Sequence, residues 1–202
     1  MKRPAYRGTL CHGGLAAFSA DPTHGAAVLA AVDPRHLDAI RGANKLAWID
    51  AEALDELNAA YLRIAGRDGY IEFWRRYTIG SVDSTLFGAL FSGALRIFGR
   101  SPAGILKWVR RAWEVTTRDY GRVEVDVEPD VVRIRLLDLP PGGRHLTVPL
   151  SMQASVMGVI EFAGHVPNVD CDLGQLERFG RCEVSARWSV VGPAVRDSGF
   201  DP

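Results

Sequence analysis

The spacing of the hydrophobic residues changes at residue 122, and this change constrains the fold more than any other feature of the chain. Between residues 50 and 120, apolar residues recur every three or four positions, which is typical of helices. From there Val123, Val125 and Val127 alternate with acidic residues, which is typical of a half-buried strand. We therefore expect an α+β fold in which an N-terminal helical half packs on a small antiparallel sheet.

Helix signals are dense before this point. Asp33-Pro34 and Ser101-Pro102 are strong starts, because the side-chain oxygen can cap free amides and proline suits the first helical turn. The segment 84–98 is apolar nearly all round, which predicts a buried helix. The expected helices are 22–32, 34–41, 50–66, 70–79, 84–98 and 101–120.

The second half predicts a hairpin, one inserted helix and two further strands. Val132, Ile134 and Leu136 alternate with arginines and make the hairpin partner of 123–127. A helix is expected from Pro149 to Gly164. The remaining strands are expected at 169–173 and 182–190.

One domain is expected to span most of the chain. Residues 25–192 carry the periodic segments, and 202 residues are enough for a single hydrophobic core. Glycines and a proline interrupt residues 1–24, which predicts an N-terminal arm or an edge strand. Residues 193–202 are expected to form a flexible tail.

Charge and hydropathy exclude several classes of partner. Twenty-four basic residues balance twenty-four acidic ones, so no net positive field favours nucleic acid. The longest apolar stretch, from Leu86 to Phe98, is shorter than the roughly 20 residues that a membrane span needs. No secretory signal begins the sequence, and three cysteines are an odd number for a disulfide framework. We expect a cytoplasmic protein without a membrane span.

No motif of a familiar enzyme or metal site occurs, so neither catalysis nor a cofactor is expected. His36, on an expected helix, is the best-placed haem ligand among isolated histidines. Cys171 and Cys182 could meet on adjacent strands, but a structural zinc site normally needs four ligands. The five histidines are His12, His24, His36, His145 and His165.

Large aromatic residues on the expected helices are the candidate ligand-binding residues. They could line an apolar pocket between helices and sheet, while packing in the core is the alternative that their helical spacing also favours. The candidates are Phe73, Trp74, Phe87, Phe91, Trp108 and Trp113.

Several of these segments together resemble a known fold. They are the helix that Ser101-Pro102 opens, the passage 119–125 into strand, the helix with Gly158 and the closing run 180–188. Over roughly residues 25–190, the pattern resembles the ligand-binding fold shared by 4-vinyl reductase domains, haem nitric-oxide-binding domains and transport-protein-particle subunits. More narrowly, it is similar to a paralogous group from myxobacteria.

The resemblance implies a non-enzymatic module for ligand sensing or protein interaction, with a small apolar ligand between helices and sheet. A protein partner or a homodimer is also expected, the latter through 84–98 if this chain does not itself bury that segment. The alternatives are a haem-based gas sensor and an uncharacterised enzyme. In the 4-vinyl reductase branch, zinc-binding cysteines would fall near Cys171 and Cys182, but residues 151–155 lack the further cysteine. The resemblance carries no haem-ligating histidine onto a definite position.

Overall fold

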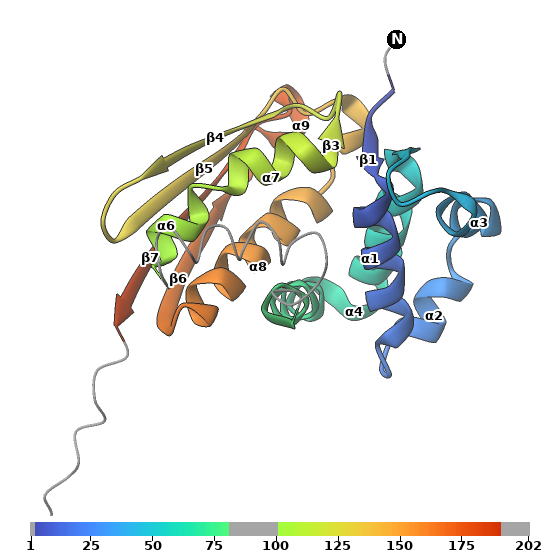
Figure 1. The fold of residues 1–202 in the computed structure, drawn as a ribbon, viewed down its shortest axis with the longest axis horizontal. Coiled ribbons are helices and arrows are strands. Elements are labelled where there is room, and N and C mark those ends of the chain that lie inside the picture. Colours follow the sequence, from blue (N-terminus) through green and yellow to red (C-terminus); the bar gives the residue numbers. More distant parts are fainter. Residues whose placement is uncertain (1–2, 81–100, 191–202) are drawn as a thin grey trace, which may run out of the picture.

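The computed structural model describes residues 3–80 and 101–190 and confirms the α+β class, with helices and two antiparallel sheets (Figure 1). The expected helix 84–98, with Phe87 and Phe91, lies outside the described residues. Within the described ranges, no helix combines the length and hydropathy needed to cross a membrane. The N-terminal elements are β1 (Ala5–Arg7), α1 (Gly8–Ala20), α2 (Gly25–Ala30), α3 (Pro34–Gly42), β2 (Trp48–Asp50) and α4 (Ala51–Gly80). The later elements are α6 (Pro102–Leu106), α7 (Val109–Thr116), β3 (Thr117–Arg118), β4 (Arg122–Val127), β5 (Val131–Leu137), α8 (Thr147–Phe162), β6 (His165–Asp172), α9 (Leu176–Phe179) and β7 (Cys182–Val190).

The N-terminal segment is not the expected arm or edge strand. β1 is the central strand of a three-stranded sheet in the order β2-β1-β3, and α1 follows it directly. The glycines of α1 are sites of close approach rather than helix breakers. A Cβ at Gly8 would lie 2.4 Å from the carbonyl oxygen of Asn44, and one at Gly14 would lie 2.9 Å from Leu54 Cδ1. These glycines let α1 pack tightly against α4 and the segment before β2.

The helices that carry the candidate site follow the sequence signals with two differences. Gly66 was expected to end a helix, and α4 breaks there, at φ 72° and ψ 178°, before it continues to Gly80. The expected helix 101–120 is two helices, α6 and α7, separated at Lys107 and Trp108. Its start is confirmed, because the amide of Gly104 donates to Ser101 Oγ at 3.4 Å. The Asp33 cap of α3 is confirmed in the same way by the amide of Arg35.

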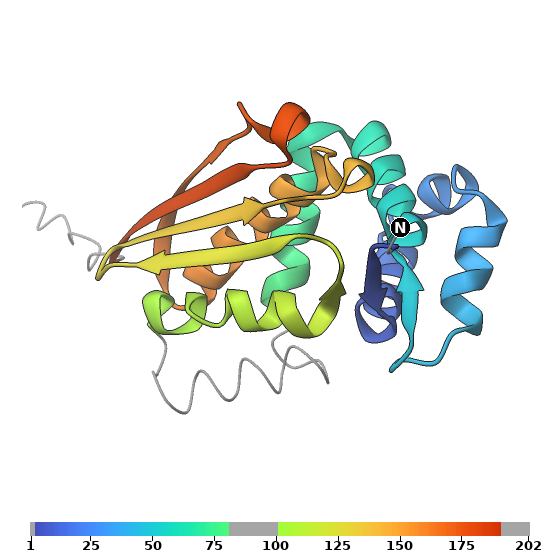
Figure 2. The ribbon, with the colours of Figure 1, turned by 90° about the horizontal axis from the view of Figure 1, so that it is seen from above.

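The C-terminal sheet has the order β4-β5-β7-β6, and every neighbouring pair is antiparallel. The expected hairpin is confirmed, and its register places Val125 opposite Ile134. β6 begins at His165, earlier than the expected Val169. Helix α8 lies between this sheet and α4, and α7 runs along the sheet at the β4 side (Figures 1 and 2). The sheet, α8 and α4 therefore form three successive layers.

Gly158 explains how closely α4 and α8 approach. A Cβ at this position would lie 2.8 Å from the carbonyl oxygen of Arg75 and 3.0 Å from Thr78 Cβ. A glycine inside a helix costs about 1 kcal/mol relative to alanine. Here the missing side chain lets the two helices come into backbone contact.

Candidate functional site

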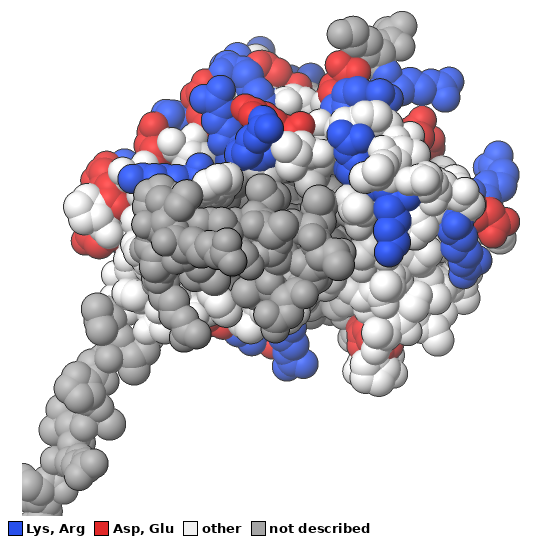
Figure 3. Space-filling view, in the orientation of Figure 1, with Lys and Arg blue, Asp and Glu red and all other residues white. Residues whose placement is uncertain are grey.

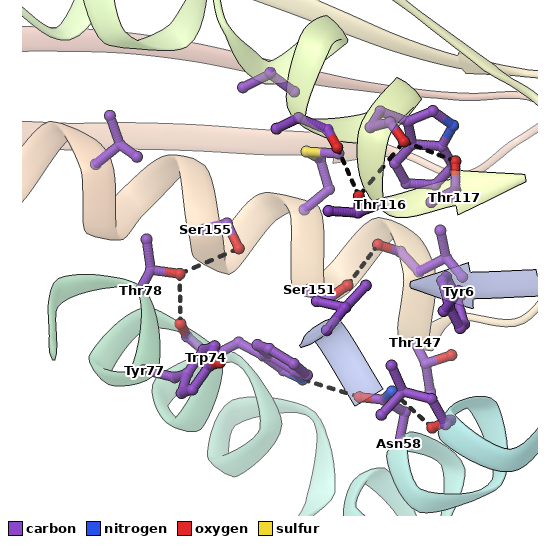
Figure 4. Close-up of a pocket in the computed structure, with 18 of the residues that line it drawn as sticks. Tyr6, Asn58, Trp74, Tyr77, Thr78, Thr116, Thr117, Thr147, Ser151 and Ser155 are labelled. Atoms are coloured by element: carbon purple, nitrogen blue, oxygen red, sulfur yellow. Dashed lines mark hydrogen bonds between the residues drawn. The ribbon is translucent and has the colours of Figure 1, made fainter. Parts of the chain in front are cut away.

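A cavity of about 220 Å³ lies between α4, α7 and α8, with β1 and α1 at one end (Figure 4). Most of its lining is apolar, and a smaller number of hydroxyl and amide groups gathers along α8 and near β1. Concave, mostly apolar sites with a few polar groups are the usual form of small-molecule sites. The apolar lining includes Leu10, Leu54, Trp74, Ile105, Trp108, Val109, Trp113, Val148, Met152 and Val159.

Three of the expected aromatic residues line this cavity: Trp74, Trp108 and Trp113. Phe73 does not line it. Its ring stacks on Phe18 of α1, with centroids 4.8 Å apart and planes at 10°, because adjacent residues on a helix point about 100° apart. Phe87 and Phe91 lie outside the described residues. The sequence therefore identified the helices that form the wall but not the side of α4 that faces the cavity.

Asn58 holds the aromatic wall on α4 in place. Its Oδ1 accepts hydrogen bonds from Trp74 Nε1 at 3.1 Å and from the Tyr70 hydroxyl at 2.8 Å, and its Nδ2 donates to the Leu54 carbonyl. Burial of a polar group is tolerated when its hydrogen bonds are made, and here all three contacts are internal. Sequence reasoning missed Asn58. The available signal was a single amide four residues after Leu54, on the apolar stripe of the helix.

One carboxylate, that of Asp55, binds two tyrosine hydroxyls at the end of the cavity next to β1. The Tyr6 hydroxyl donates to Asp55 Oδ1 at 2.9 Å, and the Tyr120 hydroxyl donates to Oδ2 at 2.7 Å. Burial raises the pKa of Asp55 to about 6, although the two tyrosine hydrogen bonds act in the opposite direction. These hydrogen bonds connect β1, α4 and the residues just before β4.

Thr147, the first residue of α8, has a different environment. The residue is 3% exposed, and its Oγ1 has no hydrogen-bond partner in the described part of the chain. Ser151, one turn later, donates to the carbonyl of Val148 at 2.9 Å, and Thr78 lies 3.2 Å from Ser155 between their oxygens (Figure 4). Thr147 is therefore a buried hydroxyl of the lining that remains unpaired.

Asp55 and Thr147 also line a second, more open groove on the outside of the molecule. This groove has a volume of about 960 Å³ and carries both Arg144 and Glu52 on its walls. Two residues are thus shared between an apolar interior cavity and a charged outer groove. Their position marks the junction between the two.

The outer face of the sheet mixes charges of both signs. Figure 3 shows basic and acidic side chains interspersed over β4, β5 and α7. Arg122 pairs with Asp138 at 3.0 Å, and Arg133 pairs with Glu128 at 2.8 Å. Exposed pairs of this kind contribute little to stability. They leave no field of one sign that would hold a nucleic-acid backbone on this face.

All five histidines lie in the described part of the chain, and none of them lines the cavity. His36 Nε2 is 3.0 Å from Glu56 Oε2, and His12 Nε2 is 2.9 Å from the carbonyl of Ala43. The sequence has no histidine between His36 and His145, and residues 81–100 contain no His, Cys, Met or Tyr. The cavity lacks the imidazole that haem iron most often uses.

The other side chains able to hold haem iron are Met152, Tyr6, Tyr70 and Tyr77 among the described lining residues. Burial raises the pKa of all three tyrosines, which opposes the phenolate form that an iron ligand requires. The Tyr70 hydroxyl is also engaged by Asn58. A thioether alone is a weak ligand, so the residues present do not fit a haem.

Cys171 and Cys182 lie on the neighbouring strands β6 and β7 as free thiols. Burial raises the pKa of Cys171 to about 11 and that of Cys182 to about 12, which opposes the thiolate form that binds metal. No group of three or more His, Cys, Asp or Glu side chains is placed to hold a metal ion within the described ranges.

Comparisons with known proteins identify the fold. No family model matches the sequence, and no curated protein matches it. Solved structures do match, and they are H-NOX domains. A mutant of the T. tengcongensis H-NOX superposes with a TM-score of 0.59 at 14% identity and covers 91% of this chain and 97% of its own. The Fe(II) unliganded H-NOX protein from K. algicida gives 0.60 at 8% identity, covering 91% and 96%.

A third neighbour is an oxygen-binding H-NOX domain related to soluble guanylate cyclases, solved as the oxygen complex. It gives a TM-score of 0.55 at 13% identity and covers 91% of this chain and 95% of its own. The chain therefore has an α+β fold that is similar to the fold of H-NOX domains. The expected resemblance to haem nitric-oxide-binding domains is confirmed for the fold. The likeness to 4-vinyl reductase domains and to a myxobacterial group stays a prediction.

Proposed function

We propose that this chain is a ligand-sensing module that uses the H-NOX fold to hold a small apolar molecule in the cavity between α4, α7 and α8. The observation that carries the proposal is the cavity itself, about 220 Å³ and lined mostly by apolar groups around three tryptophans. An engineered apolar cavity of about 150 Å³ takes up benzene. A compact apolar molecule of one ring or similar size suits this space.

The comparisons taken alone favour a second candidate, the haem-based gas sensor. One neighbour is an oxygen complex, one contains unliganded Fe(II), and another was solved to probe haem distortion in the H-NOX family. The side chains of this cavity do not favour haem, because the described lining has neither imidazole nor thiolate. We therefore place haem second, as a proposal based on the fold.

We also propose that the module is not an enzyme and that it transmits ligand binding to a partner or to a second copy of itself. Ser151 and Ser155 line the cavity, but no described histidine stands beside them to act as a base. Light scattering of the purified chain tests the second copy. A strict monomer at high concentration would count against it.

Two measurements separate the candidates. An absorption spectrum of protein expressed with added haem is expected to show no Soret band after gel filtration, and a band retained in equimolar amount would favour the gas sensor. Thermal shift with a library of compact apolar compounds is expected to give hits, because a ligand at a hundred times its Kd stabilises by about 2.7 kcal/mol. A flat response across the library would contradict the apolar-ligand proposal.

A further inference from the structure

We infer that the ligand of this cavity carries one uncharged hydroxyl group, held at the junction of Asp55 and Thr147 while its apolar body fills the cavity. This inference rests on the proposed function and adds the chemistry of the ligand's polar end. It follows from three observations: a buried hydroxyl without a partner, a carboxylate with acceptor capacity left, and the position of both on the lining.

The unpaired group is Thr147 Oγ1. The residue is 3% exposed, and its hydroxyl lacks a partner in the described part of the chain. Buried polar groups in folded proteins are nearly always hydrogen-bonded, so an unpaired one on the wall of a cavity calls for a partner inside it. The matched comparison is Ser151, also on the lining, whose hydroxyl is already paired with the Val148 carbonyl.

The carboxylate of Asp55 supplies the complementary acceptor. Each of its oxygens accepts one tyrosine hydroxyl, from Tyr6 and from Tyr120. A carboxylate has about four acceptor positions, so about two remain. Because both residues line the cavity, we place the ligand hydroxyl where it donates to Asp55 and accepts from Thr147.

Other polar ends suit the junction less well. A ligand carboxylate would face the Asp55 carboxylate, and two like charges at close range disfavour each other. A pure hydrocarbon would leave Thr147 unpaired. A quaternary ammonium ion would be attracted by Asp55, but it has no group that hydrogen-bonds with Thr147 and would have to leave water for a lining that is mostly apolar.

The test compares three probes of similar shape on the full chain: 4-ethylphenol, 4-ethyltoluene and 4-ethylbenzoate. Affinities are measured by titration of tryptophan fluorescence, since Trp74, Trp108 and Trp113 line the cavity. The phenol is expected to bind about 3- to 10-fold tighter than the hydrocarbon, as one net hydrogen bond gives. The benzoate is expected to bind more weakly than the phenol.

Variants test whether the preference for the phenol depends on the junction of Asp55 and Thr147. Thr147→Val removes the hydroxyl at nearly constant shape and is expected to abolish the preference for the phenol while 4-ethyltoluene binds as before. Thr9→Val, the control, removes another buried hydroxyl that has no partner in the described part of the chain but does not line the cavity, and it is expected to keep the preference. Thr147→Ser retains a hydroxyl and is expected to keep it too, which guards against a fold defect in the valine variant.

The outcomes distinguish this inference from the proposed function. If wild type binds phenol and hydrocarbon equally, or Thr147→Val keeps the preference, the hydroxyl inference is overturned while the cavity remains a ligand site. If none of the three probes binds and the apolar library is also flat, the proposed function fails, and the hydroxyl inference fails with it.

Discussion

The second half of α4 carries aromatic residues on two faces. One face packs against another aromatic ring, and the other borders the cavity. On one face, Phe73 stacks on Phe18 and lies 4.5 Å from Tyr61 between centroids, so that a ring of α1 occupies the space beside it. We call Phe18, Tyr61 and Phe73 the aromatic cluster. On the other face, Trp74 borders the open cavity. The difference lies in the opposing helix: α1 supplies a large ring, whereas α8 supplies Ser151 and Ser155.

The comparison teaches that aromatic residues at helical spacing do not by themselves mark a pocket. Interiors are packed to crystal-like density, and a space remains only where the neighbouring element offers small side chains. On α8 the small residues recur one turn apart. Small polar residues opposite large aromatic ones are therefore a better sign of a cavity here than the aromatic residues alone.

The largest expected effect is the difference in stability between a variant of the aromatic cluster and a variant of the cavity wall. Phe18→Ala removes a fully buried ring from the aromatic cluster and is expected to lower the free energy of unfolding by about 3 to 5 kcal/mol. Trp108→Ala, on the half-buried cavity wall, is expected to cost about 1 to 2 kcal/mol, because that ring already borders open space. Urea denaturation measures both. Equal losses would contradict the contrast between a filled face and an open face.

The next prediction compares one carboxylate from each region, because the pKa of Asp55 is raised and the pKa of Asp21 is lowered. Burial raises the pKa of Asp55 to about 6, above the value of about 3.9 for an unperturbed Asp. The folded protein therefore holds this proton more tightly than the unfolded chain. The resulting stabilisation is fully present below about pH 4 and is lost as the pH rises to about 6, by about 2 to 3 kcal/mol.

Asp55→Asn is expected to abolish this fall in stability between about pH 4 and pH 6. The control is Asp21→Asn beside the aromatic cluster. Slight burial raises the pKa of Asp21, but hydrogen bonds from Tyr61 and from the Thr23 amide outweigh it and leave the pKa below its ordinary value. Its effect on stability belongs below about pH 4 and has the opposite sign. Urea denaturation of the three proteins across pH measures both, and an unchanged slope in Asp55→Asn would contradict the prediction.

How far the sequence predicts this molecule depends on whether the signal is local. The change of period at residue 122 predicts the hairpin, and the caps at Asp33 and Ser101 predict two helix starts, because these depend on neighbours in the sequence. The N-terminal glycines were misinterpreted. Gly8 and Gly14 serve contacts with Asn44 and Leu54, and no local pattern records such distant partners.

The candidate site was predictable only in outline. Tryptophans on the right helices were expected, and Trp74, Trp108 and Trp113 do line the cavity. The polar residues Asp55 and Thr147 were not expected. Asp55 stands among other polar residues of α4 and Thr147 among apolar ones, so neither is marked by its neighbours in the sequence. The role of Asp55 comes from partners such as Tyr6, which is 49 positions away.

A tighter test of the α4–α8 contact adds one methyl group where the helices touch. Gly158→Ala places a Cβ 2.8 Å from the Arg75 carbonyl oxygen, so the helices must shift apart. Overpacking costs about 1 to 3 kcal/mol and is partly offset by the gain of about 1 kcal/mol in helix propensity. We expect a net loss of about 1 kcal/mol. Gly42→Ala, at the end of α3 with nothing within 4 Å of the added Cβ, is expected to cost nothing measurable by the same denaturation.

The smallest expected change in stability comes from a substitution that fills the cavity with a large side chain, as the aromatic cluster is filled. Ser151→Leu replaces one of the small side chains of α8 by a large apolar one that extends into the space beside the tryptophans. The apolar area gained is offset by the loss of freedom of the new side chain, so we expect a free energy of unfolding within about 1 kcal/mol of wild type. Binding of 4-ethyltoluene is expected to fall more than about tenfold, because the leucine occupies the ligand's volume. If the hydrocarbon still binds as in wild type while the variant is folded, then the ligand does not occupy the α8 side of this cavity, and the small residues there do not account for the open face.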